Sequence, residues 1–349
     1  MTTVSSGREI FIDPSSKAYY KDGLFDTFNA VLNRDDTLAP FVRLRRTEQE
    51  QGASLRTADY LMRNDNQGRP ADYYSLGVLE NYKNLLARSE VTLRAFVIFE
   101  PPVVDLRLYR ALPELTSAFE RVYVHNTLGD GYSLKNVQQL KLHKLYWPQP
   151  RKEVIQPLWN RGDRLERIVV INGNHRPRPV KGELYSKRIE AMTALAKLGV
   201  VDLYGRGWEK WWSRSSMWLP YWRNRQSLMG IYKGACDSKF EVLSQYKFCL
   251  CFENMAMQGY ITEKIFDCFY AGTIPLYLGA TDIADLIPAD AYIDCRRFSS
   301  WEQMSYAIAK LPSEKIESLK NAGREFVKSP EGLMYFNSLT QIFNVDSMK

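Results

Sequence analysis

The residues best placed to do chemistry lie within residues 246–279, where charged side chains follow a short apolar run. Residues 248–252 are too few for a helix and are bounded by polar residues, which favours a buried strand. Glu253 and Asn254 come directly after it. Ligands of open α/β sheets gather beyond the carboxyl ends of parallel strands, so these two residues predict a binding site there.

A helix is predicted next, over residues 261–270. Lys264 falls in its first turn, where unpaired N–H groups and the helix dipole favour anions by about 0.3–1 kcal/mol. A lysine at this point predicts a phosphate site, and the alternative is an ordinary solvated charge that contributes little. Residues at i, i+3, i+4 and i+7 share one helix face. Here they are Tyr260, Glu263, Lys264 and Asp267.

The complete run resembles the donor-binding motif of the alpha-1,3-fucosyltransferases, glycosyltransferase family 10. In that motif a strand ending in FEN leads to YITEK, then to AGTIP and LG. These letters stand here at residues 252–254, 260–264, 271–275 and 278–279. Met255 departs from the pattern, since a small polar residue is more usual there, and its neighbours' donor contacts are therefore in question.

The resemblance implies roles for the residues of the motif. Lys264 would stabilise the diphosphate of GDP-fucose, while Glu263 and Tyr260 would bind its fucose and ribose. Asn254 would also contact the donor, and Glu253 is a further candidate for such a contact.

A second α/β unit precedes the motif, with a predicted strand over residues 167–172 and a helix over residues 183–198. By the same resemblance, Arg188 would pair with the donor pyrophosphate, and Asn172 or Asn174 would contact the donor at the end of the strand. A guanidinium suits this task because it can bind phosphate through two parallel hydrogen bonds. The alternative for Arg188 is a solvated charge on a helix surface.

Glu100 follows a predicted buried strand over residues 93–99 and precedes Pro101, which keeps the glutamate extended. The family has a strand-end glutamate in a similar context that acts as general base. The resemblance therefore makes Glu100 the candidate catalytic residue. The alternative is an exposed glutamate beside a turn.

Composition limits the classes of partner. The net charge of +7 and the pI near 9.0 favour an anionic partner such as a nucleotide sugar, an acidic glycan or a membrane surface. No RNP, zinc-finger or basic-zipper pattern occurs, so no nucleic-acid partner is expected.

The chain has five cysteines and three histidines, and no Asp-x-Asp triplet. Reduced core thiols in a cytoplasmic protein are therefore expected, with no metal and no other cofactor. No signal peptide and no run of about 20 apolar residues are found, so the predicted protein is cytoplasmic, with peripheral contact at the inner membrane as an option.

Residues 208–222 contain five of the eight tryptophans. A hydrophobic patch that packs an irregular insertion is the favoured interpretation. The alternative is an acceptor platform or a membrane-interface contact.

The 349 residues suggest about two domains. The resemblance implies an α/β fold of the GT-B type, with two Rossmann-like domains facing a central cleft. We expect residues 1–155 to bind the acceptor and residues 156–349 to bind the donor, with the last helices able to return to the first domain. Residues 41–45 alternate apolar and basic residues, which predicts a half-buried strand.

The predicted function is inverting, metal-independent transfer of L-fucose from GDP-fucose to a hydroxyl of an oligosaccharide or glycoconjugate, in the family's common case α-1,3 to GlcNAc. One alternative is a related transferase that uses another GDP-linked or deoxy-sugar donor. The other is a non-catalytic glycan-binding protein on the same fold.

Overall fold

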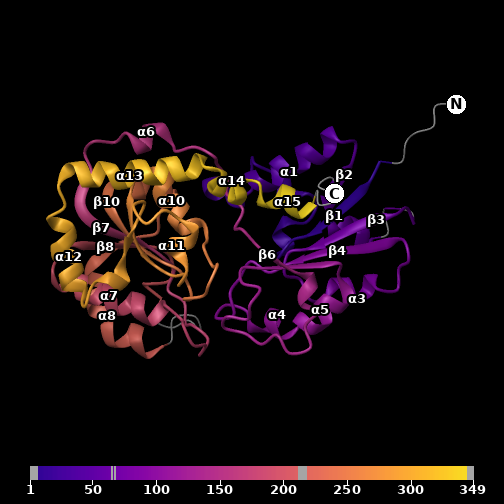
Figure 1. Ribbon diagram of the computed structural model, residues 1–349, viewed down its shortest axis with the longest axis horizontal. Helices are drawn as coiled ribbons and strands as arrows, with labels where there is room; N and C mark the ends of the chain where they lie inside the picture. Colours follow the sequence, from indigo (N-terminus) through magenta and orange to yellow (C-terminus); the bar gives the residue numbers. More distant parts are fainter. Residues whose placement is uncertain (1–6, 64–65, 67, 211–217, 344–349) are drawn as a thin grey trace. The chain divides into compact units, whose positions relative to one another are not determined.

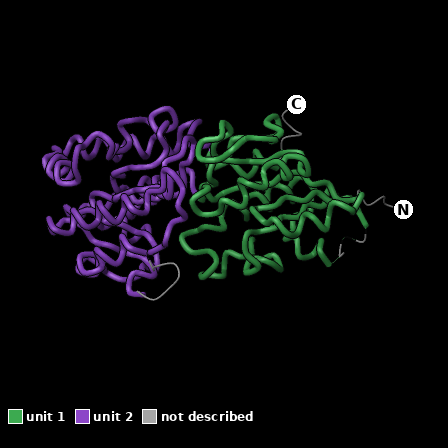
Figure 2. Tube along the Cα trace, turned by 90° about the horizontal axis from the view of Figure 1, so that it is seen from below, with its two compact units in different colours: residues 1–150, 335–349 green, residues 151–334 purple. Residues whose placement is uncertain are grey.

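The computed structural model describes residues 7–63, 66, 68–210 and 218–343 (Figure 1). The chain divides into two compact units, Met1–Pro150 with Tyr335–Lys349, and Arg151–Met334 (Figure 2). Each unit is built around a six-stranded sheet in which every paired strand runs parallel. The predicted α/β class with two Rossmann-like domains is thereby confirmed.

The first sheet has the strand order β2-β1-β3-β4-β5-β6. The direction of winding reverses between β1 and β3, which makes their carboxyl ends the switch point of the sheet. The strands are β1 (Glu9–Asp13), β2 (Ser54–Thr57), β3 (Ala71–Ser75), β4 (Val91–Val97), β5 (Arg121–Val124) and β6 (Leu142–Lys144).

Helices cover both faces of this sheet because its strands alternate apolar side chains between two cores. On β1, Ile10 and Ile12 enter one core and Phe11 enters the other. Phe343 stacks on Tyr74 of β3 with ring centroids 3.8 Å apart, so the last described helix packs in the first unit. The helices are α1 (Ala39–Glu50), α2 (Ala58–Met62), α3 (Asn81–Leu85), α4 (Leu106–Arg110), α5 (Leu112–Ala118) and α15 (Ser338–Phe343), while α14 (Pro330–Phe336) carries the chain back from the second unit.

The predicted strand over residues 41–45 is wrong, because these residues lie inside α1. Pro40 stands in the first turn of that helix, where its missing N–H costs nothing. The buried positions Pro40, Leu44 and Glu48 recur every four residues, which is helical spacing. Five alternating residues are too few to distinguish the two-residue period of a strand from the longer period of a helix.

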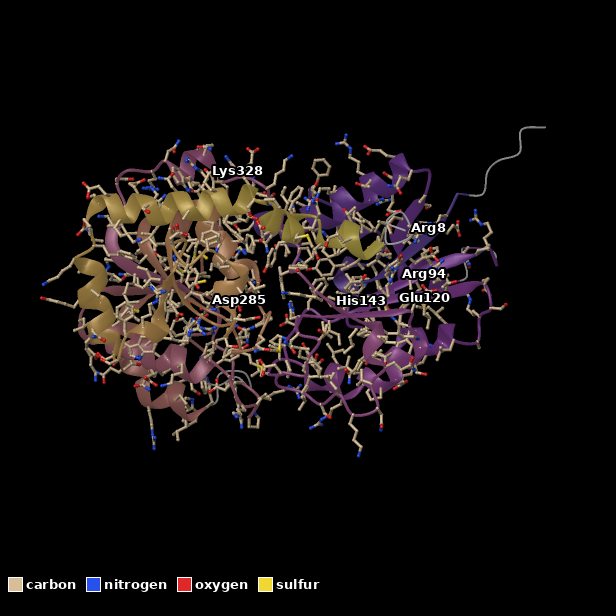
Figure 3. The ribbon with its side chains drawn as sticks, in the orientation of Figure 1. Arg8, Arg94, Glu120, His143, Asp285 and Lys328 are labelled. Atoms are coloured by element: carbon tan, nitrogen blue, oxygen red, sulfur yellow. The ribbon has the colours of Figure 1, made fainter. Side chains whose placement is uncertain are left out.

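Ion pairs gather on β3 of the first unit. Asp72 pairs with Arg8 and, at 2.6 Å, with Arg94. Arg94 also pairs with Glu120 at 3.0 Å. Figure 3 labels Arg8, Arg94 and Glu120 in this unit. Asp72 is buried, whereas Arg8, Arg94 and Glu120 are partly exposed.

The second sheet has the strand order β12-β11-β10-β7-β8-β9. Counted within this unit, the order is that of a dinucleotide-binding fold, and the winding reverses between β7 and β10. Ligand sites of such sheets lie at that reversal, beyond the carboxyl ends of the strands. The strands are β7 (Leu165–Ile171), β8 (Val201–Tyr204), β9 (Tyr232–Gly234), β10 (Tyr246–Phe252), β11 (Ile274–Leu278) and β12 (Ile293–Asp294).

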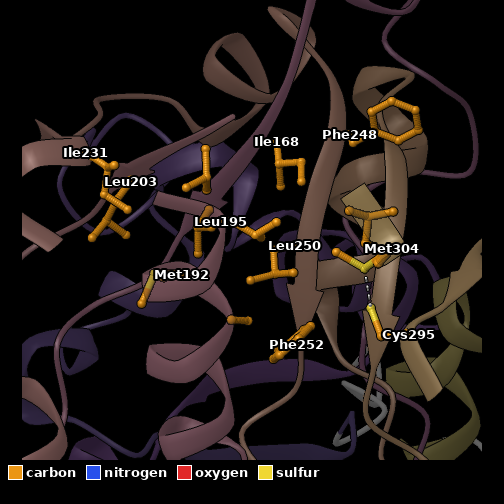
Figure 4. Close-up of a cluster of buried hydrophobic side chains, with 14 of the residues drawn as sticks. Ile168, Met192, Leu195, Leu203, Ile231, Phe248, Leu250, Phe252, Cys295 and Met304 are labelled. Atoms are coloured by element: carbon orange, nitrogen blue, oxygen red, sulfur yellow. Dashed lines mark hydrogen bonds between the residues drawn. The ribbon is translucent and has the colours of Figure 1, made fainter. Parts of the chain in front are cut away.

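One face of this sheet packs against α7, α8 and α12 (Figure 4). Phe248, Leu250 and Phe252, at every second position of β10, join that core. Cys249 and Cys251 point to the opposite face, where α10 supplies Cys268. The helices are α6 (Gln156–Trp159), α7 (Tyr185–Lys197), α8 (Leu219–Ile231), α9 (Lys239–Ser244), α10 (Glu263–Ala271), α11 (Ile283–Leu286), α12 (Trp301–Ala309) and α13 (Ser313–Lys328).

All five cysteines are free and buried, as predicted for core thiols. Within the described ranges, no cluster of three or more His, Cys, Asp or Glu side chains could hold a metal ion. A search of the same residues finds no helix that is long and apolar enough to cross a bilayer.

Asp202 of β8 links its strand to β7 and β10 of the second sheet through hydrogen bonds to its carboxylate. Its carboxylate accepts two hydrogen bonds of 2.9 Å from Arg167 of β7 and one of 3.1 Å from the Tyr246 hydroxyl of β10. Burial disfavours its charge, yet Arg167, Lys233 and Tyr246 together lower the pKa of Asp202.

We expect Asp202→Asn to lower the free energy of unfolding by about 1–3 kcal/mol, because bonds to a charged acceptor are lost. The folded pKa lies below the unfolded one, so this contribution is present above about pH 4 and is lost as the pH falls through the folded pKa. Urea titrations between neutral and acid pH measure both effects. Asp163→Asn, which alters an exposed pair with Arg161, serves as control, and an equal loss there would contradict the assignment.

Candidate active site

A cavity of about 180 Å³ lies at the switch point of the second sheet. Its lining comes from the ends of β7 and β10 and from α9 and α10. Pockets for whole small-molecule ligands usually measure about 300–1,000 Å³, so this cavity suits one polar group of a larger ligand. Its polar lining residues are Asn172, Lys239, Glu263, Lys264 and Asp267.

Lys264, in the first turn of α10, provides a positive charge at this cavity. Its ammonium donates to Thr262 Oγ1 at 2.9 Å, to Glu253 Oε2 at 3.2 Å and to Glu263 Oε1 at 3.3 Å. Burial opposes the charge, but Glu253 and Glu263 raise the pKa of Lys264. The lysine is therefore cationic at neutral pH, as a phosphate site requires.

Glu253 is fully buried at the end of β10. One of its oxygens accepts from the Thr262 backbone N–H at 2.9 Å, and the other accepts from the Thr262 hydroxyl at 2.8 Å. Burial raises the pKa of Glu253, while Lys264 opposes that shift. These bonds join the end of the strand to the beginning of α10, so Glu253 positions the helix on which Lys264 lies.

Arg188 of α7 is only 3% exposed, which excludes the solvated helix charge considered as an alternative. Its guanidinium donates to the carbonyl oxygens of Phe252 at 2.9 Å and Glu253 at 3.0 Å. Its Nε is buried without a hydrogen-bond partner in the described part of the chain. Burial lowers the pKa of Arg188, and Tyr185 and Glu253 oppose that shift. The structure thus places Arg188 against the end of β10.

Asn172 and Asn174 follow β7, and both contact the tryptophan-rich segment. Trp208 donates its indole N–H to the Asn172 carbonyl at 2.7 Å, and Trp218 donates to the Asn174 side-chain oxygen at 3.2 Å. Trp208 is 2% exposed and Trp222 is 46% exposed, so the interpretation of the whole segment as a packing patch stays a prediction. Residues 211–217 of this segment lie outside the described residues. Asn172 lines the cavity, whereas the Asn174 side chain holds Trp218 in place.

Asn254 and Tyr260 lie on the loop between β10 and α10. The Asn254 carbonyl accepts from the Leu184 N–H at 3.1 Å, and Tyr260 is 1% exposed. Met255, the departure from the family pattern, forms an antiparallel bridge with Glu183 and is 1% exposed. The loop therefore packs against residues 183 and 184, which directly precede α7. The described lining of the cavity comes from other residues. Donor contacts of Asn254 and Tyr260 stay predictions.

Tyr260 precedes α10. Asp267 shares a face of this helix with Glu263 and Lys264, as predicted, because all three line the cavity. It is 5% exposed and pairs with Lys239 of α9 at 2.6 Å. Neither Lys239 nor Thr262 was predicted to be a site residue. A threonine directly before Glu-Lys at the beginning of a helix is typical of an N-cap and could have identified Thr262. For Lys239 the sequence holds no such local signal.

Glu100 lies in the first unit, three residues beyond β4. Its side chain is partly exposed, and its carbonyl accepts from the Tyr109 hydroxyl at 3.0 Å. The adjacent Phe99 carbonyl contacts His125 Nε2, beyond the neighbouring strand β5, at 2.8 Å. Glu100 therefore occupies the carboxyl edge of its sheet, as expected for a site residue, and its role as base stays a prediction.

A glycine is required at position 205, directly after β8, because the backbone of Asn172 lies close to it. It has φ of +139°, and a Cβ atom there would lie 1.9 Å from the Asn172 carbonyl oxygen. Gly205→Ala should lower the free energy of unfolding by about 2–4 kcal/mol and disturb the cavity wall at Asn172. Gly199→Ala is the control, because Gly199 has φ of +70° and open space at its Cβ. Urea unfolding should show a loss of only about 1–2 kcal/mol there, and equal losses would contradict the steric argument.

The chain is similar in fold to glycosyltransferases of the GT-B class, and part of it matches a fucosyltransferase family. The two parallel α/β sheets, one with the strand order of a dinucleotide-binding fold, form the architecture found in solved glycosyltransferases of the GT-B class. A solved structure of an alpha1,3-fucosyltransferase with GDP has this fold. The two chains superimpose with a TM-score of 0.50 and 15% sequence identity, and the alignment covers 98% of this chain and 92% of the fucosyltransferase chain.

Residues 180–320 match the family model described as glycosyltransferase family 10 (fucosyltransferase), C-terminal part. The resemblance found in the sequence is confirmed over this interval, which includes Arg188 and all of α10.

Two relatives that are similar to this chain in sequence are also named fucosyltransferases. The alpha-(1,3)-fucosyltransferase FucT of Helicobacter pylori is 34% identical over 99 residues, 28% of this chain and 21% of that protein. The GDP-fucose protein O-fucosyltransferase 3 of Homo sapiens is 27% identical over 220 residues, 63% of this chain and 39% of that protein. The matched segments thus span less than half the length of these relatives.

Proposed function

We propose that this protein transfers L-fucose from GDP-fucose to a hydroxyl group of a glycan or glycoconjugate, with inversion and without a metal ion. The observation that carries the proposal is the cavity at the switch point of the second sheet, lined by Lys264 and Glu263. Its lining residues from α9, β10 and α10 lie within the interval that the family model matches, and those at the end of β7 precede that interval. A partly buried cation on the first turn of a helix is an arrangement that favours a diphosphate.

The second unit is proposed to bind the donor. Lys264 and Arg188 stabilise the negative charge that grows on GDP as it leaves, a role that preorganised cations fulfil in a partly dry site. Glu263 accepts from hydroxyls of the donor, because its Oε2 is a buried acceptor without a partner in the described structure. Asn254, Tyr260 and Asn172 are the remaining donor candidates.

The first unit is proposed to bind the acceptor and to supply the base. Glu100 takes the proton of the acceptor hydroxyl while its oxygen attacks C1 of fucose. The bond between C1 and the phosphate oxygen breaks, and its electron pair leaves with GDP. One displacement of this kind inverts the configuration at C1.

The acceptor class has a second candidate. The human relative is named as a protein O-fucosyltransferase, and it matches the chain over 220 residues. A serine or threonine hydroxyl of a protein would undergo the same displacement as a sugar hydroxyl. Peptide and glycan acceptors must therefore be compared directly.

The test is incubation of the protein with GDP-fucose and an array of glycan and peptide acceptors, followed by mass spectrometry. We expect a mass gain of one deoxyhexose on one acceptor class, and the same rate with and without EDTA. GDP-mannose in place of GDP-fucose tests the related-donor alternative. Binding of GDP without any transfer would favour a non-catalytic glycan-binding protein, and a loss of activity with EDTA would contradict the metal-free mechanism.

A further inference from the structure

The ammonium of Lys264 is already fully hydrogen-bonded within the chain. A lysine has three N–H donors, and here Thr262, Glu253 and Glu263 provide three acceptors between 2.9 and 3.3 Å away. A phosphate oxygen that binds Lys264 must therefore replace one of these three partners.

Two of the three partners are fixed by other contacts. Glu253 and Thr262 are both 0% exposed, and they are bound to each other through the backbone N–H and the hydroxyl of Thr262. If either side chain moved away, buried polar groups would lose their partners, which is costly in a dry environment.

Glu263 is the partner that can be replaced. Its contact with Lys264 is the longest of the three, and its side chain is 31% exposed. Burial opposes its ionisation, but Lys264 and Lys239 lower the pKa of Glu263, so it competes as a charged group. It also lines the cavity at which the ligand would arrive.

We propose that the diphosphate of the donor displaces Glu263 from Lys264, while Glu253 and Thr262 stay bound to the ammonium. This rests on the donor site proposed above. The displaced carboxylate then accepts from hydroxyls of the donor. A diphosphate without hydroxyls breaks the same contact between Glu263 and Lys264, but it donates no hydrogen bond to the displaced carboxylate. Glu263 is therefore a specificity residue that favours a complete nucleotide sugar over free pyrophosphate.

The experiment compares wild type and Glu263→Gln by calorimetric titration with inorganic pyrophosphate, GDP and GDP-fucose. A neutral amide competes less for the ammonium, so the variant should bind pyrophosphate roughly three- to tenfold more tightly. Its affinity for GDP-fucose should rise less or fall, because the charged acceptor for donor hydroxyls is lost. In a Lys264→Met background the gain for pyrophosphate should vanish.

The matched control is Asp267→Asn, since Asp267 lies on the same helix and lines the same cavity but pairs with Lys239. A gain from general removal of negative charge would appear with Asp267→Asn and persist in the Lys264→Met background. Unchanged or weaker binding of pyrophosphate by a folded Glu263→Gln protein would overturn the proposal. Failure of wild type to bind GDP would instead contradict the proposed function, because the exchange at Glu263 is measured with pyrophosphate alone.

Discussion

Glu100→Gln should lower the rate of fucose transfer by about 10²–10⁴, the usual contribution of a general base. The amide has nearly the same shape as the carboxylate but accepts no proton at neutral pH. Glu100 lies in the first unit and the cavity lies in the second, so the affinity for GDP should not change. Initial rates at saturating GDP-fucose, together with GDP titration, measure both quantities.

The control for this variant is Glu120→Gln, which removes a half-exposed carboxylate from the same unit. Its pair with Arg94 is a surface contact, so transfer should stay within about twofold of wild type. If Glu100→Gln transferred fucose at the wild-type rate, the base would have to be another residue. If it also lost GDP binding, a structural defect would explain the result.

Lys264→Met should weaken GDP binding by about 10- to 100-fold, because a hydrogen bond to a charged group contributes about 1.5–3 kcal/mol. The loss in kcat/KM should be greater, about 10²–10³, since the cation also stabilises charge that develops on the leaving GDP. Removal of the ammonium leaves Glu253 buried without its counter-charge, so the melting temperature should fall as well. Calorimetry on protein shown to be folded separates binding from stability.

Two further variants test whether the positive charge at Lys264 itself binds the diphosphate. Lys264→Arg keeps the charge and should retain more GDP affinity than Lys264→Met. Lys187→Met removes an exposed lysine of α7 that pairs with Glu190, and it should bind GDP as wild type does. If all three variants bound GDP equally well, the diphosphate would have to lie away from α10.

Much of the site could be predicted from local sequence. The buried strand at residues 248–252 and the helix after it correspond to β10 and α10, because a short apolar run and an amphipathic run with a terminal glycine are local signals. Residues 41–45 show the limit of such signals, since they lie in α1 and not in a strand. A pattern of five residues does not distinguish the two periods.

The environment of each charged side chain could not be predicted in this way. Asp267 lies on the predicted face of α10, but its ion pair with Lys239, 28 positions earlier in the chain, was not predicted. Arg188 was weighed as a surface charge, yet it is buried against carbonyls of β10. Both outcomes depend on which helix packs beside which strand, and such contacts join segments that are distant in the chain.

The sequence by itself determined the elements, the family resemblance and the candidate residues, because strand ends, helix beginnings and motif letters are properties of neighbouring residues. Only the tertiary structure decided that β7 and β10 are adjacent, and that Lys264 is bound by three oxygens of the chain. The physical reason is that a charge responds to every group within a few ångströms of it, and long-range packing selects those groups.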